Sequence, residues 1–242
     1  MNFFSDFFQT FLFKPFFNIL VLIYQYLPGH DFGIAIIILT VIIRIVLYPL
    51  MIQSIKSQKA LSELQPKLQV IQERFKNDKE RQSKELMALY QAEKVNPFGG
   101  CLPLLLQLPI LIALYRVFLT GFNSETAKHL YSFVPNPGTI NPFFLNQINL
   151  SESNSVMAIL VGITMFIQSK MMLPQARPKK SDDKMYQASE MMQKQMTYFM
   201  PLIITAALWK ISAAVSLYII VTTIFSIFQQ YLVNKEAKPI EV

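Results

Sequence analysis

The 242-residue sequence has little charge and almost no cysteine. Charged residues make up only 15% of the chain and hydrophobic residues 52%, which is outside the usual balance of a soluble domain. The single cysteine, Cys101, excludes an internal disulfide and supplies too few thiols for a cysteine-based zinc or iron–sulfur site. The two histidines, His30 and His129, lie far apart in predicted loops, so we expect no histidine-based metal site. Packing alone must hold the fold together, and lipid must solvate most of it.

The sequence also lacks the parts of an enzyme. It contains no G-x-x-x-x-G-K-[ST] phosphate loop, no H-E-x-x-H motif and no G-x-S-x-G motif. The apolar segments hold no pair of carboxylates, which an intramembrane protease or a proton relay would need. We therefore expect neither catalytic turnover nor a cofactor.

What the sequence does contain is a series of apolar segments of membrane-spanning length. The predicted spans cover residues 32–51, 98–119, 155–173, 195–209 and 212–233. Segments of about twenty residues match a hydrocarbon core about 30 Å thick, although the fourth segment is shorter. The pattern predicts an all-α integral membrane protein with five transmembrane helices in residues 32–233.

The basic residues are unevenly distributed among the connections. The loop 52–97 holds nine Lys and Arg residues and the loop 174–194 holds five, whereas the connection 120–154 holds only Lys128. The positive-inside rule then places the first two loops and the tail, residues 234–242, in the cytoplasm, and residues 1–31 outside. Because the net charge of +7 is explained by this topology, we expect a bacterial plasma-membrane protein that does not bind nucleic acid directly.

The N-terminal stretch 11–27 is apolar and aromatic, but polar residues and a proline interrupt it. The interruptions are Lys14, Pro15, Asn18 and Gln25. Such a segment can lie in the membrane interface or form an additional span, and the interruptions favour an interfacial helix.

The first cytoplasmic loop, 52–97, carries a helical pattern despite its charge. Its apolar residues recur at spacings of three and four: Leu61, Leu64, Leu68, Ile71 and Phe75. Residues 76–79 are typical of a turn, after which Leu86 and Leu89 or Tyr90 continue a second helix. The pattern predicts an antiparallel helical hairpin, and Pro66 is expected to interrupt its first helix and leave it mobile.

Arg44 lies inside the first span, where a charge is costly. One interpretation is that its side chain snorkels toward the inner headgroups; the other, which we favour, is that it faces a wet interior cavity. Polar residues of the spans could line the same cavity: Thr40, Gln107, Gln168, Thr222, Thr223 and Ser226. Because no acidic residue lies inside a span to neutralise Arg44, the pattern predicts a cavity that receives an anionic group.

Several segments resemble one family of membrane proteins. They are 40–49 (TVIIRIVLYP), 64–67 (LQPK), 87–103 (MALYQAEKVNPFGGCLP), 162–168 (GITMFIQ) and 193–201 (QKQMTYFMP). Over about residues 10–235 the chain resembles the YidC/Oxa1/Alb3 membrane protein insertases, in a short form without a large extracytoplasmic domain. It departs from the family's usual Pro-Ser-Gly type turn after Trp209, where it has Lys210 and Ile211.

The resemblance implies an insertase that uses no nucleotide, with a hydrophilic groove open to cytoplasm and lipid but closed outside. Arg44 matches the family's groove arginine, which attracts acidic groups in the translocated tail of a substrate. Thr40 and Tyr218 match positions along the groove and the substrate path, and the hairpin matches a mobile cytoplasmic element. The implied partners are nascent membrane proteins, lipid, the ribosome and a Sec-type translocon.

A small-molecule transporter or channel with Arg44 as its anion site is the alternative. It predicts inverted repeats and a pore that reaches both faces, but the sequence shows no internal repeat. A third alternative, a purely structural membrane subunit, would give Arg44 no function. We therefore predict a membrane protein insertase and chaperone for short or few-span substrates.

Overall fold

Helices account for nearly all the regular structure in the computed structural model, which describes residues 3–96, 99, 102–121, 126–172, 191 and 195–236. In chain order they are α1 (Phe3–Phe8), the π-helical η1 (Gln9–Phe13), α2 (Lys14–Tyr26), α3 (Phe32–Val46), α4 (Tyr48–Arg74), α5 (Lys79–Ala92), α6 (Leu102–Gly121), the 3-10 helix η3 (Thr126–His129), α7 (Ser155–Met171), the π-helical η4 (Gln195–Phe199), α9 (Met200–Leu208) and α10 (Ala213–Glu236). Two short strands, β1 (Phe143–Phe144) and β2 (Ile148–Asn149), pair antiparallel between η3 and α7. The predicted all-α membrane fold is confirmed.

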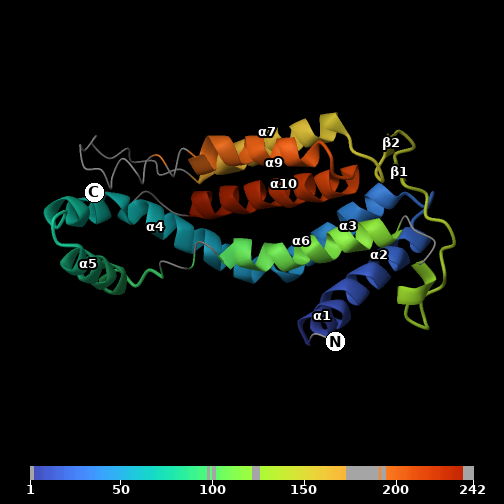
Figure 1. Ribbon diagram of the computed structural model, residues 1–242, viewed down its shortest axis with the longest axis horizontal. Coiled ribbons are helices and arrows are strands. Elements are labelled where there is room, and N and C mark those ends of the chain that lie inside the picture. Colours follow the sequence, from blue (N-terminus) through green and yellow to red (C-terminus); the bar gives the residue numbers. More distant parts are fainter. Residues whose placement is uncertain are drawn as a thin grey trace.

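Helix α10 lies at the centre of the bundle. It packs most extensively against α7 and α3, and it also contacts α4, α6 and α9. Figure 1 shows α7 and α9 on one side of α10, and α3 and α6 on the other. A continuous apolar core joins α10 to α2, α3, α6, α7 and α9, with Phe17, Ile36, Leu114, Ala158 and Leu217 among its buried members. Side chains of α10 can therefore contribute to any site between the bundle helices.

The chain bends inside the first predicted span, 32–51. Helix α3 ends at Val46 and α4 begins at Tyr48, and the two helix axes differ in direction by 67°. Pro49 explains the break, because proline has no N–H to donate to the carbonyl of Ile45 and its ring crowds that carbonyl. The other predicted spans fall on α6, α7, η4 with α9, and α10, although residues 98, 100, 101 and 173 lie outside the described residues.

Length and hydropathy distinguish two groups among the described helices. The segments Asp6–Tyr26 and Ala213–Lys235 are each long and apolar enough to cross a membrane, and the bent pair α3 and α4 would make a third span. Shorter apolar helices cover Leu105–Thr120, Ser155–Met171 and Thr197–Leu208. At about 1.5 Å per residue, these are shorter than a hydrocarbon core of about 30 Å. The count of five spans stays a prediction.

The N-terminal helix, formed by α1, η1 and α2, lies obliquely against the bundle (Figure 1). Phe13 and Phe17 are buried where it packs against α3 and α6. Near its start, the ring of Phe8 lies 5.2 Å from the guanidinium carbon of Arg116, which belongs to the later half of α6. This oblique course suits an interfacial helix, but the segment also has the length and hydropathy of a span, so the interfacial placement stays a prediction.

A loop formed by residues 126–154, here called the cap, covers one end of the bundle. Hydrogen bonds tie it to α2 and α3: Asn18 Nδ2 to His129 O (3.0 Å), Tyr131 N to Asn18 Oδ1 (2.7 Å), Asn141 N to Tyr24 Oη (2.9 Å) and Leu145 N to Asp31 Oδ2 (2.6 Å). The first residues of α10 also donate to the cap, Ala213 to Glu152 O (2.7 Å) and Ala214 to Leu150 O (3.1 Å). The N-terminus of α10 is therefore fixed at the cap end.

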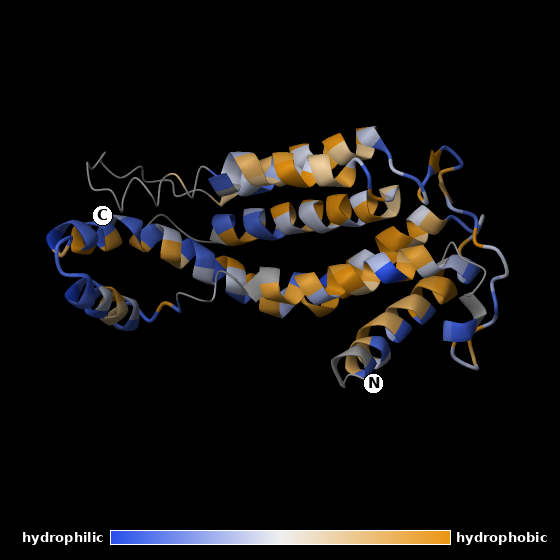
Figure 2. Cartoon of the chain, in the orientation of Figure 1, coloured by the Kyte–Doolittle hydropathy of each residue, from blue (hydrophilic) through white to orange (hydrophobic). Residues whose placement is uncertain are grey.

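The predicted helical hairpin is confirmed as α4 and α5, which project beyond the bundle (Figure 1). Leu64 and Leu68 are buried in its apolar seam, and Asp78 caps α5 by accepting a hydrogen bond from Arg81 N at 3.0 Å. The expected interruption at Pro66 is wrong, because α4 continues through it. A single proline removes only one helical hydrogen bond, and the seam on either side keeps the two helices together. Figure 2 shows a hydrophilic hairpin beside a largely hydrophobic bundle.

Candidate functional site

Arg44 points into the bundle and is 6% exposed. The helical period of α3 places Thr40 and Ile43 on its buried side, whereas Ile45 and Val46 are exposed to the surroundings of the bundle. A snorkelling arginine would extend along the exposed side toward the headgroups. The burial of Arg44 therefore fits the cavity interpretation better than the snorkelling one.

A hydrogen-bonded chain connects Arg44 to two other helices. Arg44 Nη2 donates to Gln107 Oε1 of α6 at 3.3 Å, which is at the long end of the range for such bonds. Gln107 Nε2 in turn donates to the hydroxyl oxygen of Tyr218, which is 2% exposed on α10. The amide of Gln107 thus turns its oxygen to the cation and its nitrogen to the phenol. Arg44, Gln107 and Tyr218, all named as candidates from the sequence, are thus brought together by hydrogen bonds.

The charge of Arg44 has no acidic partner among the residues that the structure describes. The ion pairs found there, Lys67 with Glu93 and Lys84 with Glu80, both belong to the hairpin. A guanidinium carries five N–H donors, and Gln107 accepts from only one nitrogen of Arg44. The site therefore presents a buried positive charge with unused hydrogen-bond donors, which suits an incoming carboxylate.

Thr40 and Gln168 lie outside this hydrogen-bonded chain. Thr40 is buried one turn before Arg44 on the same face of α3, and its hydroxyl donates to the carbonyl of Ile36 at 2.7 Å. The hydroxyl oxygen of Thr40 can accept a further hydrogen bond, but its one proton is already donated to Ile36. Gln168 is half-buried on α7, which packs against α9 and α10, so α10 separates it from α3 and α6. Within the described part of the chain, Gln168 makes no hydrogen bond to Arg44, Gln107 or Tyr218.

Buried polar residues of α10 extend the site, and some of them were not anticipated. Thr222, Thr223 and Ser226 were expected to line the cavity, and all three are buried. The sequence analysis missed Gln229 and Gln230, which are 0% and 5% exposed at the far end of the same helix. Gln229 follows Tyr218 by eleven residues, about three helical turns, and this spacing could have revealed it on the same side of α10.

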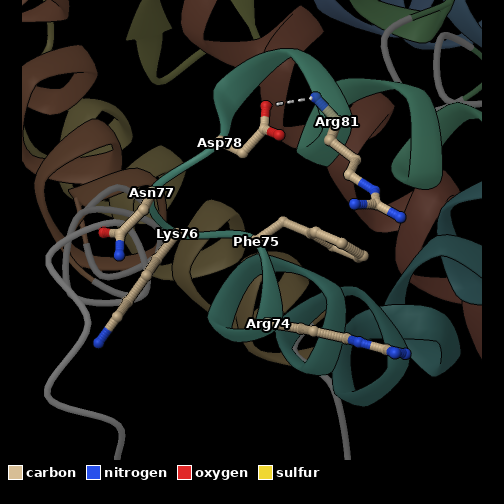
Figure 3. Close-up of a pocket in the computed structure, with 6 residues that line it drawn as sticks. All are labelled: Arg74, Phe75, Lys76, Asn77, Asp78 and Arg81. Atoms are coloured by element: carbon tan, nitrogen blue, oxygen red, sulfur yellow. Dashed lines mark hydrogen bonds between the residues drawn. The ribbon is translucent and has the colours of Figure 1, made fainter.

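A separate pocket of about 400 Å³ lies at the tip of the hairpin (Figure 3). The guanidinium carbons of Arg74 and Arg81 lie 5.5 and 5.3 Å from the centre of the Phe75 ring. Both arginines are exposed, so their charges are solvated, unlike that of Arg44. Elsewhere on the hairpin, partial burial raises the pKa of the Tyr90 phenol above its ordinary value, which keeps it neutral. The tip and the bundle site are thus electrostatically different places.

Within the described residues, no group of three or more His, Cys, Asp or Glu side chains could hold a metal ion. The unfilled capacity of the bundle site is of another kind: one cation together with amide, hydroxyl and phenol groups. Such groups recognise charge and hydrogen-bonding capacity.

Sequence comparison identifies proteins similar to this chain. The profile of a family described as 60Kd inner membrane protein matches residues 22–239. The membrane protein insertase YidC of Geobacter metallireducens is 35% identical over 222 residues, and that of Syntrophus aciditrophicus is 36% identical over 217 residues. The membrane protein insertase YidC of Wigglesworthia glossinidia brevipalpis is 35% identical over 232 residues.

These alignments cover most of this chain but only part of each relative. They include 92%, 89% and 96% of the present chain, and 36%, 35% and 38% of the three relatives in the same order. The chain therefore spans somewhat more than a third of the length of these proteins. Arg44, Gln107 and Tyr218 all lie within the segment that matches the family profile.

Proposed function

The chain belongs to the 60Kd inner membrane protein family, and on that premise we propose that it is a membrane protein insertase and chaperone. It moves substrate helices and short hydrophilic tails from the cytoplasm into the bilayer through a polar groove centred on Arg44. The observation that carries this proposal is the buried cation with only a neutral hydrogen-bond partner among the described residues. Neither these residues nor the similar proteins offer an observation that favours a transporter or channel.

Arg44 attracts the acidic groups of a substrate tail. Two unit charges about 4 Å apart interact by about 4 kcal/mol at an effective dielectric constant of about 20. The incoming carboxylate displaces the long hydrogen bond to Gln107, and no carboxylate of a described residue has to leave. Gln107 and Tyr218 hold the guanidinium in place between tail passages. Capture is therefore favourable and remains reversible, because nothing covalent forms.

The apolar part of the substrate supplies the remaining driving force. A substrate helix that leaves the groove sideways exchanges water for lipid, which gains about 25 cal/mol for each Å² of apolar surface. Insertion therefore requires no nucleotide. The cap closes one end of the bundle through its hydrogen bonds to α2, α3 and α10, so a tail enters from the opposite end.

The orientation follows the basic loops. The hairpin, the loop 174–194 and the tail 234–242 lie in the cytoplasm. Of the loop and the tail, the structure describes only Met191 and residues 234–236. The cap and residues 1–31 lie on the outer side. The exposed, charged hairpin is the part that meets a ribosome or a Sec-type translocon. The partners of the groove are nascent membrane proteins and lipid.

Reconstitution tests this function directly. The purified protein is placed in liposomes, and a one-span substrate with a short acidic tail is added. We expect the tail to become protected from external protease in proteoliposomes, while empty liposomes of the same lipids give little protection. Equal protection in both preparations would show that the chain does not act as an insertase.

A further inference from the structure

A row of buried polar side chains leads along α10 away from Tyr218. Tyr218, Thr222, Ser226 and Gln230 follow one another at intervals of four residues, so each lies next to the one before it and the row winds slowly around the helix. Each is at most 9% exposed, and Gln229, beside Gln230, is 0% exposed. From Tyr218 to Gln230 the row extends for about 18 Å, at about 1.5 Å per residue. Because α10 begins at the cap, Gln229 and Gln230 lie toward the opposite end of the bundle, where α10 is more hydrophilic (Figure 2).

The glutamines at the end of this row have amide atoms without a hydrogen-bond partner within the described part of the chain. Neither Nε2 nor Oε1 of Gln229 is bonded, and Oε1 of Gln230 is also unbonded. The hydroxyls of Thr223 and Ser226, by contrast, donate to the carbonyls of Ile219 and Thr222 of their own helix. Leaving a buried amide unbonded costs stability, so a group that formed hydrogen bonds with Gln229 would remove this cost.

The chemistry of an amide indicates what that partner is. Gln229 is uncharged and offers both donors and an acceptor, which are the groups that pair with the C=O and N–H of a peptide backbone. A hydrophilic tail that leaves water must find partners for the backbone groups of every residue, whatever its sequence. An anion would use only the amide N–H, and an apolar side chain would use neither group.

We propose that Gln229 and Gln230 form a binding site for the main chain of the substrate tail, through which the tail reaches Arg44. This inference rests on the proposed insertase function and deepens it. Arg44 selects tails by charge, whereas the two glutamines hold any tail by its backbone. The site is therefore indifferent to sequence except where a residue lacks an N–H, as proline does.

The test compares two neutral tails of equal length in the liposome assay, one rich in Gly and Ser and one rich in Pro. The double variant Gln229→Leu, Gln230→Leu removes the amides at similar volume. We expect it to slow insertion of the Gly/Ser tail about tenfold, the factor given by about 1.4 kcal/mol. The Pro-rich tail should be affected much less. The matched control is Phe228→Leu with Tyr231→Leu, since these neighbours are 57% and 58% exposed.

The outcomes separate three conclusions. A selective loss on the Gly/Ser tail supports main-chain binding, whereas equal loss on both tails, or no loss on either, overturns it. When main-chain binding is overturned in this way, the insertase function still stands if the double variant inserts acidic tails and this insertion depends on Arg44. If the unaltered protein inserts neither tail, the proposed function itself has failed.

Cross-linking keeps the inference testable if the double variant does not fold. In a Cys101→Ser background, Gln230→Cys should form a disulfide with a single cysteine in the arrested tail, and Tyr231→Cys should not. Equal cross-linking at both positions would contradict the site, because Tyr231 faces away from the polar row.

Discussion

The hairpin and the bundle both hold arginine and lysine, but they treat these charges in opposite ways. On the hairpin, Lys67 pairs with Glu93, Lys84 pairs with Glu80 at 2.8 Å, and the side chains stay largely in water. In the bundle, Arg44 is 6% exposed and bonds to a neutral amide. Exposed ion pairs contribute little energy, whereas a desolvated charge interacts strongly with whatever reaches it. The hairpin charges suit a solvated surface, and Arg44 suits a binding site.

Buried glutamines show the same difference between the two regions. Gln82 of the hairpin is 2% exposed, donates to Gln72 O at 2.9 Å and accepts from Lys79 Nζ at 3.3 Å. Gln229 of the bundle is equally buried, but its amide is unbonded among the described residues. In the hairpin a buried amide therefore joins two helices, while in the bundle a buried amide makes no such bond. The two regions therefore differ in how they hold charges and amides, and we expect them to lie on different sides of the membrane boundary.

The largest expected effect concerns placement. In a Cys101→Ser background, Asn136→Cys in the cap should react with an impermeant thiol reagent added outside intact cells, while Ser83→Cys on α5 should be shielded. Both native side chains are exposed in the structure, so access depends on the membrane alone. Permeabilised cells should label both positions. External labelling at position 83 would place the hairpin outside and remove its proposed cytoplasmic role.

Arg44 should show the next largest effect. Arg44→Ala should slow insertion of an acidic tail at least tenfold, Arg44→Glu should slow it further, and Arg44→Lys should retain most activity because the charge remains. A matched neutral tail should be nearly unaffected. The measurement is protease protection, with the membrane level of each variant checked by immunoblot.

The control for Arg44 is its exposed neighbour, in Ile45→Ala. This change alters the exposed side of α3 and should leave insertion of both tails unaffected. Equal loss on acidic and neutral tails in Arg44→Ala would mean that the arginine supports the structure or the hydration of the groove. No loss on either tail would remove it from the mechanism.

Sequence patterns predicted the helices better than the contacts between side chains of different helices. The spacing of Leu64 and Leu68 gave the hairpin seam, because helix periodicity is local. The bend at Pro49 was missed, since hydropathy stays high across it. Gln107 and Tyr218 were named as site residues, and the structure links them to Arg44 in one hydrogen-bonded chain, but nothing in the sequence says that their side chains bond to each other. Gln168 was grouped with them because polarity along a helix does not reveal which neighbour it faces.

The buried amides should respond oppositely to the same substitution. Gln82→Leu removes the bonds to Gln72 and Lys79 and should weaken the hairpin by about 1 kcal/mol, which corresponds to roughly fivefold faster hydrogen exchange in α5. Gln229→Leu should leave α10 as protected as before or more so, since an unbonded buried amide is replaced by an apolar group. Faster exchange throughout α10 in Gln229→Leu would show that this amide supports the fold.

The ion pair between Lys67 and Glu93 should have the smallest effect. The two side chains are 60% and 36% exposed, so water already solvates both charges and salt screens their attraction. Lys67→Ala should therefore change the stability of the hairpin by less than about 1 kcal/mol, and added salt should reduce that change further. Hydrogen exchange of α5 in the intact protein, measured for Lys67→Ala, Glu93→Ala and the double variant, isolates the coupling between them. Insertion of acidic tails should not change, because these charges lie on the hairpin and Arg44 lies in the bundle. A coupling well above 1 kcal/mol would mean that the hairpin shields its charges from water. The hairpin charges would then differ from Arg44 only in having acidic partners.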